Sequence, residues 1–96
     1  MTNYECMYIL KPDLEEEAKN ALVAKFSDIV AQNGGEIEKV DEWGKKRLAY
    51  PINYINDGYY VLMYFSAPAD LPAELERNFK ISDDVMRYIV INLDKE

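Results

Sequence analysis

Residues that favour β-strands gather in four parts of the chain. In Tyr4–Leu10 successive residues divide cleanly between two faces, as they do in a half-buried strand. Tyr59–Phe65 is the strongest such stretch, and Val85–Leu93 is the last one. A further strand begins at Glu36 and, after an interruption, resumes over Arg47–Ile52. The pattern therefore predicts four strands.

The second of these strands is irregular. Ile37 and Val40 do not fall on the same face of a strand, and Trp43-Gly44 breaks the pattern again. We therefore expect a bulge or a kinked hairpin near residues 41–45. Asn56-Asp57-Gly58 has the composition of a turn and predicts the connection to the third strand.

Two stretches have helical periodicity. Apolar residues of the first recur at helical spacing: Leu14, Ala18, Leu22, Phe26, Ile29 and Val30. Asp13, with Glu16 three residues later, predicts an N-cap with a capping box, and the acidic Glu15–Glu17 suits the start of a helix. Gly34-Gly35 predicts the end of this helix.

The second helical stretch is shorter. Pro68 and Asp70 open it, and Ser82-Asp83-Asp84 closes it. Its apolar positions are Leu71, Leu75 and Phe79.

The resulting order of elements is β-α-β-β-α-β. Two right-handed β-α-β crossovers over an antiparallel sheet give an α+β, ferredoxin-like sandwich with strand order 4-1-3-2 and both helices on one face. A chain of 96 residues suits a single domain, residues 1–96. No run of 18 apolar residues occurs, and Met1–Glu5 lacks the layout of a signal peptide, so we expect a cytosolic protein.

The helices can cover only one face of the sheet, which leaves an open face. If Cys6 and Tyr8 face the helices, alternation assigns these residues to the open face: Glu5, Met7, Ile9, Tyr60, Leu62, Tyr64, Arg87, Ile89 and Ile91. Scattered apolar residues are normal on a protein surface. This face is nevertheless more apolar than a solvated sheet face, so we predict contact with a protein partner through Met7, Ile9, Tyr60, Leu62 and Tyr64.

Few residues suit catalysis or metal binding. Histidine is absent, and the single cysteine, Cys6, lies in a strand pattern where a buried thiol is expected more often than a nucleophile. The dense carboxylate groups, Glu15–Glu17 and Asp83-Asp84, are explained by a helix start and a turn. We therefore predict a protein that is not an enzyme and that needs no metal or other cofactor.

Cations are concentrated at one place in an acidic chain. Asp and Glu number 18 against 11 Lys and Arg, a net charge of −7, yet Lys45, Lys46 and Arg47 are consecutive. We place this triplet at a hairpin turn and edge strand, where charges often only prevent edge-to-edge pairing. Three cations exceed that need, so we favour phosphate contact, with Lys80 and Arg87 as further candidates.

Other proteins with this fold bind RNA bases, hydrolyse acyl phosphates or bind small molecules. The Tyr59–Phe65 strand faintly resembles the base-stacking strand of RNA-recognition modules, but it lacks their basic start and Gly-Phe core. An acyl-phosphate hydrolase needs an arginine in a phosphate cradle after the first strand, and a small-molecule regulatory domain needs a glycine-bearing loop there. The loop Lys11-Pro12-Asp13 supplies neither, and fold analogy alone is a weak argument.

Several strings of residues together carry a resemblance that spans nearly the whole chain. The most specific one is Gly44-Lys45-Lys46-Arg47-Leu48-Ala49-Tyr50-Pro51-Ile52. The others are Tyr4-Glu5, Lys11-Pro12, Gly34-Gly35, Val40, Gly58-Tyr59-Tyr60 and the segment from Phe79 to Tyr88. In these strings the chain resembles the bacterial small-ribosomal-subunit protein six family.

The resemblance implies a structural component of the central platform of the small ribosomal subunit. It implies binding to small-subunit ribosomal RNA as a heterodimer with small-subunit protein eighteen. It also implies RNA contacts at Lys45, Lys46, Arg47, Lys80, Arg87, Tyr4 and Tyr50. Thr2-Asn3, Ser82 and Met86 stand where relatives can be more basic, which favours dependence on a basic partner. We hypothesise that the open sheet face and the edge of the second strand hold that partner.

Overall fold

Four strands and two helices follow one another in the predicted order. The computed structural model describes residues 1–52 and 55–94, without the side chains of residues 49–51. Its strands and helices are β1 (Thr2–Leu10), α1 (Glu16–Gln32), β2 (Glu36–Ile52), β3 (Ile55–Ala67), α2 (Leu71–Ile81) and β4 (Val85–Asn92).

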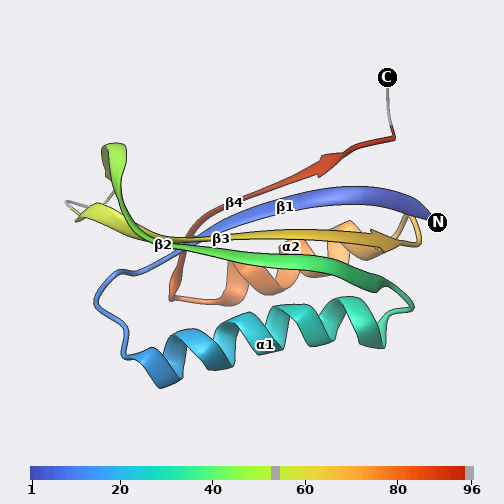
Figure 1. Cartoon of the computed structure of the whole chain (residues 1–96), viewed down its shortest axis with the longest axis horizontal. Coiled ribbons are helices and arrows are strands. Elements are labelled where there is room, and N and C mark those ends of the chain that lie inside the picture. Colours follow the sequence, from blue (N-terminus) through green and yellow to red (C-terminus); the bar gives the residue numbers. More distant parts are fainter. Residues whose placement is uncertain (53–54, 95–96) are drawn as a thin grey trace.

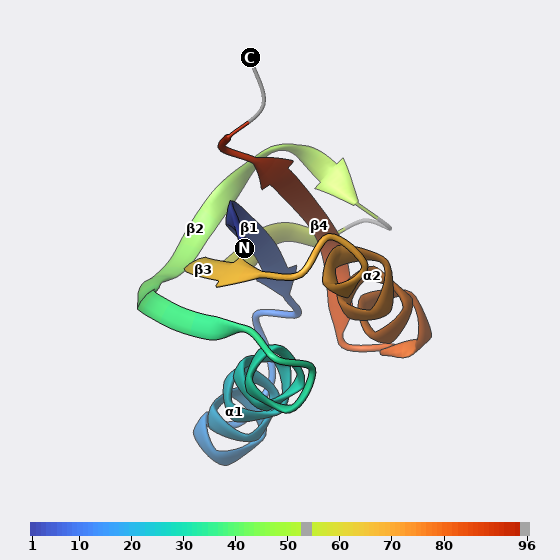
Figure 2. The ribbon, with the colours of Figure 1, turned by 90° about the vertical axis from the view of Figure 1, so that its right-hand side faces the viewer.

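The strands form one antiparallel sheet in the order β2-β3-β1-β4, which confirms the predicted topology. Strand β1 lies in the interior of the sheet and pairs with both β3 and β4. Both helices lie on the same side of the sheet, below it in Figure 1 and on the lower side in Figure 2. The other side has no helix, so the ferredoxin-like sandwich has an open face, as predicted.

The core fills the space between the sheet and the helices. Tyr8, Phe26 and Phe79, from one strand and two helices, are essentially inaccessible to solvent, with ring centroids 4.5–5.1 Å apart. Such aromatic pairs contribute about 0.5–1.5 kcal/mol each beyond the area they bury. Cys6 is fully buried beside them, and burial raises the pKa of its thiol to about 12. The interpretation of Cys6 as a buried thiol is confirmed.

The ends of the helices agree with the sequence in part. Helix α1 ends before Gly34, whose φ of +86° places it in the left-handed region that favours glycine. At the other end the predicted capping box is wrong, because Glu15 is the N-cap residue and makes no side-chain capping bond. Residues 12–14 form a turn first, and Leu14 packs against the core from there. Helix α2 lies between Asp70 and Ser82, as expected.

The bulge expected in β2 is confirmed. The pairing of β2 with β3 shifts between Glu42 and Gly44, so Trp43 is the extra residue. Gly44 has φ +84°, and a Cβ atom there would have no heavy atom within 4 Å. The glycine is therefore required by the backbone conformation of the bulge and not by lack of space.

The turn predicted at Asn56-Asp57-Gly58 is wrong. These residues belong to β3, and Ile52 and Ile55 form the last described pair of the hairpin. Gly58 has a different purpose from a turn glycine. A Cβ atom at Gly58 would lie 2.3 Å from Cγ2 of Ile9, so the missing side chain lets Ile9 pack directly on the β3 backbone.

The open face is partly covered by the chain itself. Beyond the bulge, the end of β2 rises above the sheet on the side away from the helices (Figure 1). Ile9 and Leu62 lie on the open face as predicted, yet they are only 4% and 8% exposed. Leu48 of β2, also 8% exposed, packs over Gly58 beside Ile9.

Candidate nucleic-acid interface

The run Lys45-Lys46-Arg47 lies within β2, which is an edge strand of the sheet. The edge position is confirmed, whereas the predicted turn position is wrong because these residues pair with Tyr59, Gly58 and Asp57 of β3. All three cations are exposed. The ladder therefore holds the backbone of the triplet in place while its side chains extend into solvent.

Strand alternation divides the triplet between two faces. Lys45 and Arg47 are paired with Tyr59 and Asp57, and so share the side on which Tyr59 packs against the core. Lys46 is paired with Gly58 and lies on the open side. A single edge strand thus presents cations on both of its faces.

These side chains have few partners within the protein. In the described part of the chain, neither Lys45 nor Arg47 makes an ion pair or a side-chain hydrogen bond. Lys46 Nζ lies over the ring of Trp43, 5.9 Å from its centroid. By contrast, Arg77 is held by Glu74, with Nη2 to Oε1 at 2.7 Å and Nε to Oε2 at 3.1 Å. The triplet, unlike Arg77, keeps its charge available for an external anion.

Two more predicted cations lie at the same end of the molecule as the β2–β3 hairpin. Lys80 is exposed in the last turn of α2, and Arg87 is exposed near the start of β4. The end of α2, the start of β4 and the hairpin all lie at the left-hand end of Figure 1. The fold therefore gathers at one end cations that are up to 42 residues apart in sequence.

The two predicted tyrosines differ from the cations. Tyr4 is 6% exposed and stacks on Phe65, with centroids 5.5 Å apart and planes at 29°. Its ring is part of the core and has no face free for a base, so we leave it out of the interface proposed below. The side chain of Tyr50 lies outside the described residues.

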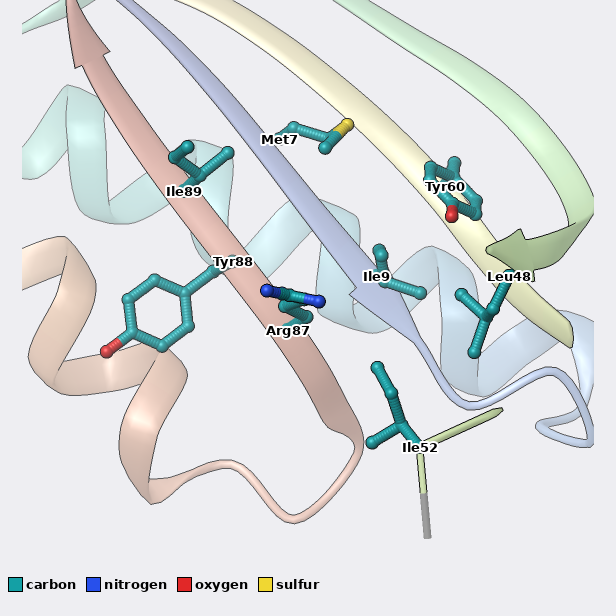
Figure 3. A pocket seen from close by; sticks show the side chains of 8 residues that line it. All are labelled: Met7, Ile9, Leu48, Ile52, Tyr60, Arg87, Tyr88 and Ile89. Carbon is teal, nitrogen blue, oxygen red and sulfur yellow. The ribbon is translucent and has the colours of Figure 1, made fainter. Parts of the chain in front are cut away.

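A groove of about 290 Å³ is hollowed into the open face (Figure 3). Its lining combines residues of all four strands: Met7, Ile9, Leu48, Ile52, Tyr60, Arg87, Tyr88 and Ile89. Three of them, Met7, Ile9 and Tyr60, are among the predicted partner contacts. Leu48 and Ile52 were not predicted, although alternation from Lys46 places Leu48 on the same face.

The other two predicted partner contacts continue this face along β3. Leu62 is paired with Met7, and Tyr64 is paired with Glu5. Tyr64 is half-buried. The pKa of its hydroxyl is raised mainly by partial desolvation and to a smaller extent by a hydrogen bond to Glu5. On β4, which is separated from β3 by β1, Ile89 and Ile91 are 48% and 42% exposed. The apolar surface therefore extends from the groove across Met7 to Ile89, whereas Glu5 lies between Tyr64 and Ile91.

The described residues contain no arrangement that suits a metal. No three His, Cys, Asp or Glu side chains in residues 1–52 and 55–94 come close enough to hold an ion. In the same ranges, no helix is long and apolar enough to cross a membrane.

Comparison with known proteins identifies the family. The family model described as ribosomal protein S6 matches residues 3–92 of this chain. The chain belongs to the ribosomal protein S6 family. It is 53% identical over 95 residues to small ribosomal subunit protein bS6 of Clostridium novyi and 56% identical over 95 residues to that of Alkaliphilus oremlandii. Each match covers 99% of this chain and 100% of the relative.

A solved structure supports the same assignment. The crystal structure of 30S ribosomal protein S6 from Thermotoga maritima superposes with a TM-score of 0.91 at 29% identity, covering 95% of this chain and 86% of that one. Membership of the S6 family makes this protein a structural component of the small ribosomal subunit, not an enzyme. As a ribosomal protein it works in the cytoplasm.

Proposed function

We propose that this S6-family protein binds small-subunit ribosomal RNA in the central domain, which forms the platform, as a heterodimer with small-subunit protein eighteen. The observation that carries the proposal is the presence of two different surfaces on one acidic protein. One is the exposed cation triplet Lys45–Arg47 on the edge strand, and the other is the apolar groove of the open face.

The end of the molecule that carries Lys45–Arg47, Lys80 and Arg87 suits phosphate groups. Lysine and arginine contacts to phosphates supply the salt-dependent part of RNA affinity, and arginine binds a phosphate through two parallel hydrogen bonds. The first turn of α1, with Glu16 and Glu17, lies below the sheet at this same end (Figure 1). Phosphates are repelled there, so RNA is expected to approach from the hairpin side.

The open face suits a protein. Its groove and the exposed Ile89 and Ile91 form an apolar surface of the kind that marks protein contacts. With a net charge of −7 the lone protein has little attraction for a polyanion, whereas a basic partner offsets that charge. Met7, Ile9, Tyr60, Leu62 and Tyr64 remain the proposed contacts.

A gel-shift titration tests the proposal. The central-domain fragment of small-subunit ribosomal RNA is titrated with this protein alone, and then with an equimolar amount of protein eighteen. We expect a shift only when both proteins are present. A shift at the same concentration without the partner would refute the heterodimer, and no shift in either arm would refute RNA binding.

A second experiment tests the partner surface. The double variant Tyr60→Ser, Tyr64→Ser changes two half-exposed positions without changing charge, and leaves the buried Leu62 intact. We expect weaker heterodimer formation by calorimetry, at least ten-fold for the loss of two aromatic contacts. Ile81→Ser is the matched control, because Ile81 is 62% exposed at the end of α2, away from the sheet face. Equal affinity of all three proteins would refute the surface assignment.

A further inference from the structure

Trp43, the extra residue of the β2 bulge, is a large aromatic side chain in an exposed position. It is 48% exposed, next to the cation triplet, and it is the only tryptophan of the chain. Single exposed apolar residues are common and need no explanation by themselves. Three further observations distinguish Trp43: the fixed orientation of its ring, the charge of the neighbouring Lys46, and the shape of the bulged backbone.

The indole ring is held in place from two sides. Its Nε1–H donates a hydrogen bond to Asp41 Oδ2 at 3.1 Å, and the ammonium of Lys46 lies 5.9 Å from the ring centroid. A tryptophan fixed in this way loses little further freedom when a flat ligand stacks on it. The ring is therefore preorganised while about half of it remains in solvent.

The β2 bulge sets the direction of the Trp43 side chain. Trp43 is the residue inserted between Glu42 and Gly44, and Gly44 takes the left-handed conformation that the bulge needs. Bulges change the direction of a side chain on an edge strand. Asp41 and Lys46 lie on the open side, and their contacts with the Trp43 ring place the ring on that side too. Glu42 lies on the core side and accepts a hydrogen bond from the Tyr59 hydroxyl at 2.7 Å.

We infer that Trp43 is a stacking platform for an unpaired RNA base, with the phosphate of that nucleotide at Lys46. This inference rests on the RNA binding proposed above and adds a base contact to it. An aromatic ring beside cations is the combination that binds single-stranded nucleotides, because the ring stacks the base and the cation neutralises the phosphate. The Asp41 carboxylate repels phosphate on its side of the ring, which leaves Lys46 as the place for it. A basic protein partner would be repelled by the same triplet, so we assign this part of the β2 edge to RNA and not to the protein partner that was hypothesised there from the sequence.

The test uses the preformed heterodimer with protein eighteen and the central-domain RNA fragment. Trp43→Ala is expected to weaken RNA binding roughly ten-fold, the effect of losing one stacked base. The slope of log affinity against log salt should stay the same, since no cation is lost, whereas Lys46→Gln should reduce that slope by about one. Trp43→Phe keeps a stacking ring and should bind within about three-fold of the original protein.

The fluorescence of Trp43 shows whether RNA or the protein partner contacts the ring. The heterodimer with Trp43→Phe lacks this tryptophan, so its fluorescence is the background that is subtracted. We expect quenching when RNA is added to the heterodimer. For the affinity measurement with Trp43→Ala, the matched control is Leu93→Ala. Leu93 is also an exposed apolar residue, 49% exposed beyond β4, and its substitution should leave RNA affinity unchanged.

Two outcomes would overturn the inference alone: unchanged RNA affinity of Trp43→Ala, or fluorescence that changes on adding protein eighteen and no further with RNA. Failure of the original heterodimer to bind RNA would overturn the proposed function as well.

Discussion

The two faces of one sheet are closed to very different degrees. On the helix face, Tyr8, Val61 and Phe65 are inaccessible to solvent beneath α1 and α2. On the open face, the end of β2 folds back and Leu48 packs beside Ile9, while Ile89 remains 48% exposed. Two helices cover one face of the sheet, whereas the end of one strand covers part of the other face. We conclude that stability is concentrated on the helix face, which leaves the open face available for the protein partner proposed above.

The largest expected effect tests this contrast directly. Phe79→Ala removes a ring packed against Tyr8, Phe26 and Tyr88, and should reduce the free energy of unfolding by about 3–5 kcal/mol. Ile89→Ala, on the exposed face, should change it by less than about 1 kcal/mol. Urea unfolding measures both. Similar losses in the two variants would contradict the division between faces.

Alkaline pH should weaken the packing of the helix face. Burial, with a smaller contribution from the Glu76 charge, raises the pKa of Cys6 from 9.0 to about 12. Folding therefore favours the protonated thiol: this stability is complete below pH 9 and is lost as pH rises toward 12. Urea midpoints between pH 8 and 11 should fall less steeply in Cys6→Ala, although that variant starts less stable. Parallel curves for the two proteins would contradict the prediction.

A glycine substitution tests how the open face is closed. Gly58→Ala places a methyl group 2.3 Å from Ile9 Cγ2 and 3.3 Å from Leu48 Cδ2, and should cost about 1–3 kcal/mol by overpacking. The matched control is Gly44→Ala, which meets no atom within 4 Å and costs only its left-handed backbone conformation, about 1 kcal/mol. Urea unfolding of both variants decides, and a larger loss at Gly44 would show that packing on Gly58 matters little.

The smallest effect concerns recognition without loss of stability. Arg47→Glu and Arg87→Glu should each weaken the ternary complex with RNA and protein eighteen, about ten-fold or more, while both variants still fold cooperatively in urea. Lys25→Glu makes the same change on exposed α1 and should leave RNA binding intact. Gel shifts measure the complex. Normal RNA binding by both arginine variants would refute the cation assignment.

Local patterns predicted the fold because each element has a clear periodicity of its own. Alternation in β1 placed Cys6 and Tyr8 correctly, and Gly34 marked the true end of α1. The errors came from residues with two physical uses. Gly58 follows Asn-Asp, as in a turn, but its missing Cβ serves packing against Ile9. Asp13 has the form of a cap, but a turn after Pro12 delays the helix.

The candidate interface was harder to predict than the fold. The cation triplet could be read directly from the sequence, and alternation already placed Tyr4 on the core side with Cys6. The covering of Ile9 by Leu48 could not be read in the same way, because it depends on the rise of β2 after the bulge. Local periodicity carries no information on such long-range curvature. The exposure of Trp43 follows from the same bulge.

The interior position of β1 has a consequence for synthesis of the chain. Thr2–Leu10 leaves the translating ribosome first, yet its two neighbours, β3 and β4, begin at Ile55 and Val85. Both hydrogen-bonding edges of β1 therefore stay unpaired until β3 and β4 have been made, and Val90 pairs with Cys6 from 84 residues further along the chain. Unpaired apolar edges are open to wrong pairing until then. The unpaired β1 strand is therefore exposed to wrong pairing while this ribosomal protein is itself being synthesised.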